Sequence, residues 1–111
     1  MPVGKDVPRD IGNRSKRRGP RMNSHVAVVI EWNGIGSGLA EKAFTRVVNN
    51  YGCLLVSPSE AELQQYLGLT NLATRQATNG MVIWKGAKRD GGWELGVEFV
   101  AAESDFWGLD L

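Results

Sequence analysis

The stretch His25-Val-Ala-Val-Val-Ile-Glu-Trp32 decides the fold class of this 111-residue chain. It is rich in β-branched residues and short enough to be a single strand. Asn33-Gly-Ile-Gly-Ser-Gly38 then breaks the strand, because clustered glycine and asparagine are typical of loops. The next run, Glu41 to Val48, also favours a strand through its β-branched content. Two short β-prone runs in succession indicate an all-β protein.

A hairpin is predicted from the residues that follow. Asn49-Asn-Tyr-Gly52 has the composition of a turn, and Cys53-Leu-Leu-Val56 continues as a strand that Pro58 ends. This strand pairs with Glu41–Val48 in the prediction.

The run Glu62 to Leu69 follows, with a turn at Asn71-Leu-Ala-Thr74. Two further apolar runs come after it, Gly80-Met-Val-Ile-Trp84 and Trp93-Glu-Leu-Gly-Val-Glu-Phe99. The latter alternates between large apolar residues and small or charged ones, as a half-buried strand does. Lys85 to Gly92 between them is predicted as a loop. Asn79-Gly80 leaves two alternatives: a hairpin turn at that dipeptide, or a bulge at Gly80 inside one long strand.

Short strands with glycine-rich connections predict an all-β fold, a six-stranded antiparallel β-barrel. Ser104 to Leu111 is predicted to form a short C-terminal helical turn, capped by Ser104, that closes one end of the barrel. The aromatic residues of the second half are interpreted as core or plug rather than as a platform for bases: Trp84, Trp93, Phe99, Phe106 and Trp107.

Charge is distributed unevenly between the N-terminus and the rest of the chain. Residues 1–21 hold seven of the 13 Lys and Arg residues and two of the 12 acidic ones, so this segment carries about +5 and the remainder about −4. Residues 1–16 are predicted to be a flexible basic arm, and residues 17–111 a single barrel domain. An acidic body argues against a general nucleic-acid-binding surface, so no specific nucleic acid is expected as a partner.

Enzymatic and metal chemistry have little support in the sequence. One cysteine, Cys53, and one histidine, His25, cannot form the usual four-ligand zinc site, and nothing completes a nucleophilic triad around them. We therefore expect a non-enzymatic protein with no catalytic residues, no metal and no cofactor.

No apolar run reaches the roughly 20 residues that span a bilayer, so no membrane insertion and a cytoplasmic location are expected. The Gly34–Gly38 loop lacks the full spacing of a nucleotide-binding glycine loop.

The order of these parts resembles the PilZ domain family over roughly residues 14–107. Two features carry the resemblance: Arg17-x-x-x-Arg21 before the first strand, and a turn ending in Gly52 between the second and third strands. An alternative frame, Arg14-x-x-x-Arg18, also fits the first motif. The resemblance implies a bacterial receptor domain for the second messenger cyclic di-GMP, which binds to an R-x-x-x-R arm and to a [D/N]-x-S-x-x-G turn.

The second motif is incomplete in this chain. With Gly52 aligned, Val47 stands where the family has Asp or Asn, and Asn49 stands where it has Ser. The resemblance implies ligand contacts from Arg17, Arg18, Arg21, Asn49 and Gly52, with affinity weakened at position 47.

Three functional hypotheses follow. The first is a cyclic di-GMP receptor in which ligand binding orders the arm and changes the surface offered to a downstream protein partner. The second is a degenerate PilZ domain that acts as a protein-protein interaction module without ligand binding. The third, a small barrel whose arm binds single-stranded nucleic acid, conflicts with the acidic body.

Overall fold

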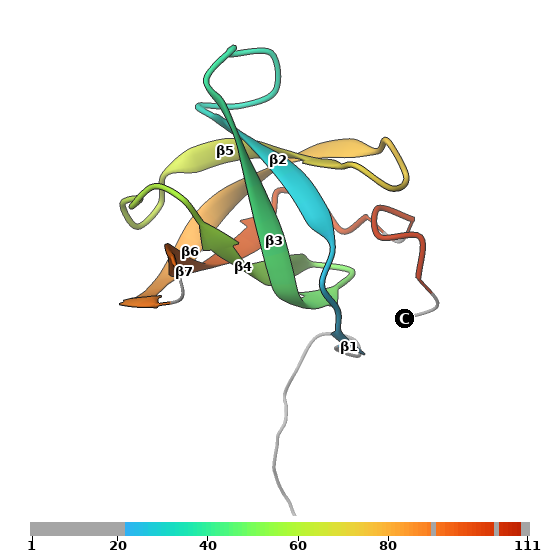
Figure 1. Cartoon of the computed structure of the whole chain (residues 1–111). Helices are drawn as coiled ribbons and strands as arrows, with labels where there is room; N and C mark the ends of the chain where they lie inside the picture. The colour runs from blue at the N-terminus through green and yellow to red at the C-terminus, as the bar shows by residue number, and fades with distance from the viewer. Residues whose placement is uncertain (1–21, 90, 104, 110–111) are drawn as a thin grey trace, which may run out of the picture.

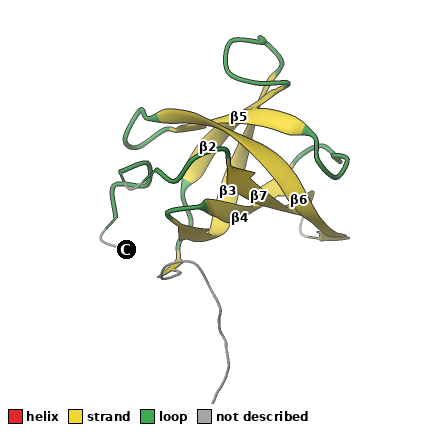
Figure 2. Cartoon of the chain, turned by 180° about the vertical axis from the view of Figure 1, so that it is seen from behind, coloured by secondary structure: helices red, strands yellow, loops and turns green. Residues whose placement is uncertain are grey.

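The computed structural model describes residues 22–89, 91–103 and 105–109. Its elements are seven strands (Figure 1): β1 Met22–Asn23, β2 Ala27–Trp32, β3 Ala40–Asn49, β4 Gly52–Ser57, β5 Tyr66–Asn71, β6 Ala77–Arg89 and β7 Gly92–Phe99. The described residues contain no helix (Figure 2).

Six of the strands form a closed antiparallel barrel. Their order is β3-β2-β5-β6-β7-β4, and the pairing of β4 with β3 closes the circle. The predicted all-β, six-stranded antiparallel barrel is therefore confirmed. The short strand β1, which pairs with the end of β3 at Val47 and Val48, beyond the residues that pair with β2, was not predicted.

The β3–β4 hairpin forms where the sequence predicted it. Asn49 pairs with Gly52, which leaves Asn50 and Tyr51 as the turn. Strand β3 also covers the whole predicted run from Glu41 to Val48.

Strand β6 differs most from the prediction. Asn79-Gly80 makes no turn and no bulge: both residues lie inside β6, where Gly80 pairs with Leu67 and Phe99. The register instead shifts between Val82 and Trp84, and again between Lys85 and Lys88.

The predicted loop from Lys85 to Gly92 is also wrong, because β6 continues to Arg89 and β7 begins at Gly92. Gly80 suits this interior position because a Cβ there would lie 2.8 Å from the side chain of Val97.

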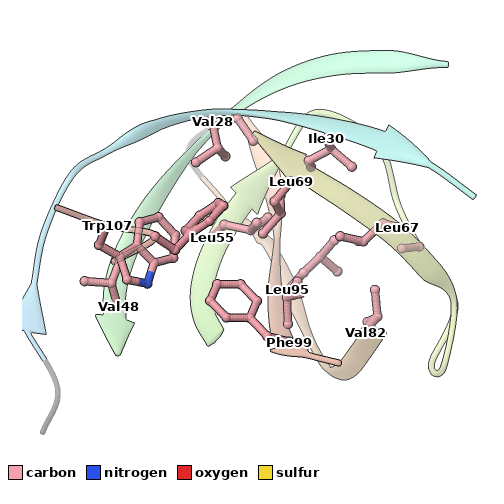
Figure 3. Close-up of a cluster of buried hydrophobic side chains, with 14 residues drawn as sticks. Val28, Ile30, Val48, Leu55, Leu67, Leu69, Val82, Leu95, Phe99 and Trp107 are labelled. Atoms are coloured by element: carbon pink, nitrogen blue, oxygen red, sulfur yellow. The ribbon is translucent and has the colours of Figure 1, made fainter. Parts of the chain in front are cut away.

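The core fills the space that the strands enclose (Figure 3). Every second side chain of a strand points inward, and most of these are aliphatic. Fourteen buried residues form the cluster: Val28, Ile30, Ala43, Val48, Leu55, Ala61, Leu67, Leu69, Val82, Leu95, Val97, Phe99, Phe106 and Trp107.

The C-terminal segment contributes the last two members of the core. Phe106 and Trp107 pack on Phe99, with ring centroids 5.1 and 6.0 Å away. The Phe106 carbonyl accepts hydrogen bonds from Asn71 Nδ2 (2.9 Å) and Thr74 Oγ1 (3.0 Å). The predicted helical turn is not confirmed: the described residues 101–103 and 105–109 form turns and bends. The segment nevertheless covers barrel residues as expected of a plug.

Trp84 corrects the interpretation of the aromatic residues. Phe99, Phe106 and Trp107 are buried and Trp93 is partly buried, but Trp84 is 47% exposed. Val82 points inward, so strict alternation would also place Trp84 inside. The register shift after Val82 puts Trp84 opposite Gly96, on the outer face, next to the exposed Ile83.

Candidate functional site

The described part of the chain begins beside the end of β3. Arg17, Arg18 and Arg21, and the predicted arm 1–16, lie outside the described residues. The first described residue is Met22, which directly follows Arg21. In β1, Met22 pairs with Val48 and Asn23 pairs with Val47. The attachment point of the arm is thus adjacent to position 47, the first position of the second motif.

A buried threonine holds this junction in place. Thr45 is fully buried, and its Oγ1 donates to the Ser24 carbonyl and accepts from the Val26 amide at 2.9 Å. The Ser24 amide in turn donates to the Arg46 carbonyl at 3.0 Å. These bonds fix the link between β1 and β2 against β3.

Asn49, the predicted serine substitute, already supports the hairpin turn. Its Oδ1 accepts the Tyr51 amide at 2.8 Å, and its backbone carbonyl accepts Trp107 Nε1 at 2.8 Å. The side chain therefore forms a turn within its own hairpin, as Asn commonly does. A ligand that contacts Asn49 would meet the donor end of the amide, since the oxygen is engaged.

Gly52 has a structural reason to be glycine that is independent of any ligand. A Cβ at this position would lie 1.9 Å from the Val97 carbonyl oxygen and 3.1 Å from the Glu98 Cα. Any side chain would force β4 away from β7. Gly52 lets the hairpin pack tightly on β7 and leaves the sheet without a side chain there.

The three motif positions share the outer face of the barrel. Val48 and Leu55 are fully buried and point inward, so Val47 and Leu54, which pair with each other, point outward. By the same register Asn49 and Gly52 form the next outward pair. The structure thus brings positions 47, 49 and 52 together on one face, where the apolar, partly buried Val47 lies between Asn23 of β1 and Leu54 of β4.

Two polar groups at this end of the barrel were missed by sequence reasoning. Asn50 Oδ1, in the turn, is buried and has no hydrogen-bond partner. Glu98 pairs with Gly52 across β4 and β7 and lies between the inward-pointing Val97 and Phe99, so its side chain is on the outer face. No pattern in the sequence signals either one, because both placements depend on strand register.

Other candidate chemistry in the described residues has structural explanations. His25 is exposed and stacks on Phe44, with ring centroids 4.6 Å apart. Cys53 is partly buried and packs on the core, and burial raises the pKa of its thiol well above the ordinary range, so the thiol stays protonated and unreactive. Among the described residues, no group of three or more His, Cys, Asp and Glu side chains could hold a metal ion.

The glycine loop between β2 and β3 uses its amides within the chain. Gly36 N–H donates to Glu31 Oε2 at 3.1 Å, and Ile35 N–H donates to Asn79 Oδ1 at 3.2 Å. These contacts are typical of a strand connection, and a carboxylate beside the loop disfavours a phosphate there.

No helix in the described part of the chain is long and apolar enough to cross a membrane.

No family model matches this chain, and no curated protein matches it.

Proposed function

We propose that this chain is a PilZ-type receptor that binds cyclic di-GMP between its basic arm and the outer face of the β3–β4 hairpin. The proposal is supported by the pairing of β1 with β3, which puts Met22, the residue after Arg21, opposite Val48 on β3. Arg21 and position 47 are 26 residues apart in the sequence, and Asn23, two residues after Arg21, pairs with Val47.

The chemistry of the arm suits a ligand with two phosphates. Guanidinium groups bind phosphate oxygens through paired, charge-assisted hydrogen bonds, and they can also pair with guanine O6 and N7. Arg21 immediately precedes Met22, and Arg17 is four residues earlier. Even a fully extended chain keeps Arg17 within about 17 Å of Met22, so both arginines can reach a ligand on the hairpin.

Val47 sets the expected affinity. Its side chain points to the outer face but offers no hydrogen bond, so a ligand edge that an Asp would bind loses that partner. A lost hydrogen bond costs about 0.5–1.5 kcal/mol when neutral and about 1.5–3 kcal/mol when charged, which corresponds to binding that is about 2-fold to somewhat over 100-fold weaker. We expect weakened binding, not its absence.

Calorimetric titration of the full chain with cyclic di-GMP tests the proposal. Arg17→Ala and Arg21→Ala should each nearly abolish binding, whereas Arg75→Ala, which changes an exposed arginine in the β5–β6 connection, is the matched control. The double substitution Val47→Asp with Asn49→Ser should tighten binding, since both positions lie on the outer face. No heat at millimolar ligand would refute the proposal, and unchanged affinity in the arginine variants would refute the site.

A second candidate, a degenerate PilZ domain that binds a protein instead of a nucleotide, is favoured by an apolar surface around β6. Large apolar side chains there are 38–57% exposed: Leu63, Tyr66, Met81, Ile83 and Trp84. Tyr66 pairs with Met81 across β5 and β6, and Ile83 and Trp84 follow on the outer face. A clustered apolar surface of this kind commonly marks a protein interface. Failure of the titration would leave this candidate as the better account.

A further inference from the structure

We infer that this chain forms a weak, reversible homodimer through the outer face of β3, β4 and β7, with β4 of one copy against β4 of the other. The inference is independent of the proposed ligand, because it concerns how the chain associates by itself. It rests on the outward side chains of β4 and on the charges of the two strands that flank it.

Strand β4 is apolar on both of its faces. Cys53-Leu-Leu-Val56 is a continuous apolar run, whereas an antiparallel strand with one face in solvent normally alternates between apolar and polar residues. Leu55 points into the core (Figure 3), so Leu54 and Val56 point outward, where both are only partly buried. Strand β4 therefore has the composition of a strand that is covered on both sides.

The neighbouring strands extend this apolar surface. Phe44 of β3, which is 40% exposed, pairs with Val56. Gly96 of β7 pairs with Leu54 and contributes no side chain, so it leaves a shallow gap beside Leu54. We call the surface formed by Phe44, Leu54, Val56 and Gly96 the β4 face. A second sheet can pack closely on such a face, because side chains of packed sheets interdigitate.

Trp84 borders the β4 face as a positioned aromatic side chain. It pairs with Gly96 across β6 and β7. A Cβ at Gly96 would lie 3.0 Å from the Trp84 Cβ, and a Cβ at Gly86 would lie 2.6 Å from Trp84 Cη2. The indole thus lies against the backbone of both glycines, while Trp84 stays 47% exposed. Burying an aromatic side chain that is already positioned costs little conformational entropy, and Trp is accordingly enriched among residues that dominate binding.

The charges on the two sides of β4 favour a second copy as the occupant. Strand β3 carries the exposed bases Lys42 and Arg46, and β7 carries Glu94 and Glu98. Because β3 and β7 flank β4, a two-fold axis along β4 places β3 of one copy over β7 of the other. Bases then face acids in both halves of the contact, as a self-complementary interface requires. A partner with a single sign of charge would meet like charges on one side.

The size of the β4 face sets the expected affinity. The four strands, with β6 included, are about 4.8 Å apart, and three outward residues on each strand span about 20 Å, which gives about 400 Å² on each copy. Stable interfaces bury about 800 Å² on each partner, so we expect a dimer with a Kd of about 10–100 µM. Val47, which pairs with Leu54, also belongs to the proposed ligand site, so the dimer is tested without ligand.

Sedimentation velocity of the ligand-free chain from about 1 µM to about 1 mM tests the inference. The wild-type chain should change from monomer to dimer over this range. Phe44→Lys and Leu54→Lys should each weaken the dimer at least about 10-fold, because each buries a charge in an apolar contact. Leu72→Lys is the matched control: Leu72 is 39% exposed in the β5–β6 connection, away from the β4 face, and its variant should dimerise like wild type.

Urea unfolding checks that the variants fold, and Phe44→Lys decides the outcome if Leu54→Lys does not. A wild-type chain that stays monomeric at about 1 mM overturns the inference. The inference is also overturned if Leu63→Lys, in the apolar surface around β6, dissociates the dimer while Phe44→Lys leaves it intact, since the copies then associate through that other surface. Assemblies larger than a dimer would contradict the two-fold contact. The titration with cyclic di-GMP decides the proposed function separately.

Discussion

Replacing Gly52 with alanine should destabilise the barrel strongly, whether or not a ligand binds. The new Cβ would lie 1.9 Å from the Val97 carbonyl oxygen, whereas Cβ atoms in proteins essentially never come within 3.0 Å of such an atom. The hairpin must therefore move from β7 by about 1 Å. That movement strains the pairing of Gly52 with Glu98 and the hydrogen bond from the Phe99 amide to the Tyr51 carbonyl, which is 2.7 Å long.

The cost can be estimated from these contacts. Overpacking a tight site costs about 1–3 kcal/mol, and each weakened hydrogen bond adds about 0.5–1.5 kcal/mol. We expect Gly52→Ala to lower the free energy of unfolding by about 2–4 kcal/mol, which lowers Tm by about 8–20 °C for a domain of this size. Urea unfolding followed by tryptophan fluorescence measures the change, since Trp107 is buried beside the hairpin.

Gly36→Ala is the control for this experiment. Gly36 also has a positive φ, of 90°, but a Cβ there would meet nothing within 4 Å. Its substitution carries only the conformational cost of about 1–2 kcal/mol. If Gly52→Ala lowers the free energy of unfolding no more than Gly36→Ala does, the hairpin does not pack on β7 as closely as described here.

Two further predictions concern the arm junction and acid stability. Thr45→Val keeps the side-chain volume but leaves the Ser24 carbonyl and the Val26 amide without their partner. Urea unfolding should show that the free energy of unfolding falls by about 2 kcal/mol or more, and ligand binding by the arm should weaken. An unchanged free energy of unfolding would mean that Thr45 does not hold the junction. Hydrogen bonds from Ser59 Oγ and Trp32 Nε1 lower the pKa of Glu41 below its ordinary value. These bonds therefore stabilise the folded state at any pH above the ordinary pKa. The stabilisation is lost as the pH falls through the lowered pKa of the folded state. Glu41→Gln should therefore be less stable than wild type at pH 7, with the gap closing below about pH 4; a gap that is independent of pH would contradict the assignment.

The fold class was predictable because short-range patterns control it. The β-branched runs at 25–32 and 41–48 and the alternation at 93–99 each identify a strand without knowledge of its neighbours. The turn at Asn49–Gly52 was predictable for the same reason, since Asn49 bonds to Tyr51 only two residues away.

Features that depend on pairing between distant strands were not predictable. Asn79-Gly80 is a strong turn signal by itself, but here Gly80 is held between β5 and β7, and the close approach of β7 explains the glycine. Strand β1 has only two residues and no periodicity, and it exists because β3 extends far enough to pair with it.

The candidate site also combines features that were predictable with features that were not. The spacing of residues in the sequence identified the motif positions. It could not show that they share one face of the barrel, because that depends on the register of β3 with β4. Gly52 and Glu98 are 46 positions apart in the sequence, and only the β4–β7 pairing makes them neighbours.

A titration of the ¹⁵N-labelled chain with cyclic di-GMP, followed by amide chemical shifts, tests whether the arm and the β3–β4 hairpin form one ligand site. Chemical-shift changes should cluster in residues 17–23, in residues 47–52 and at Glu98, with the loop from Asn33 to Leu39 unchanged as an internal reference. Shifts that appear in only one half of the site, that cluster elsewhere on the barrel, or that are absent at millimolar ligand would contradict a single site.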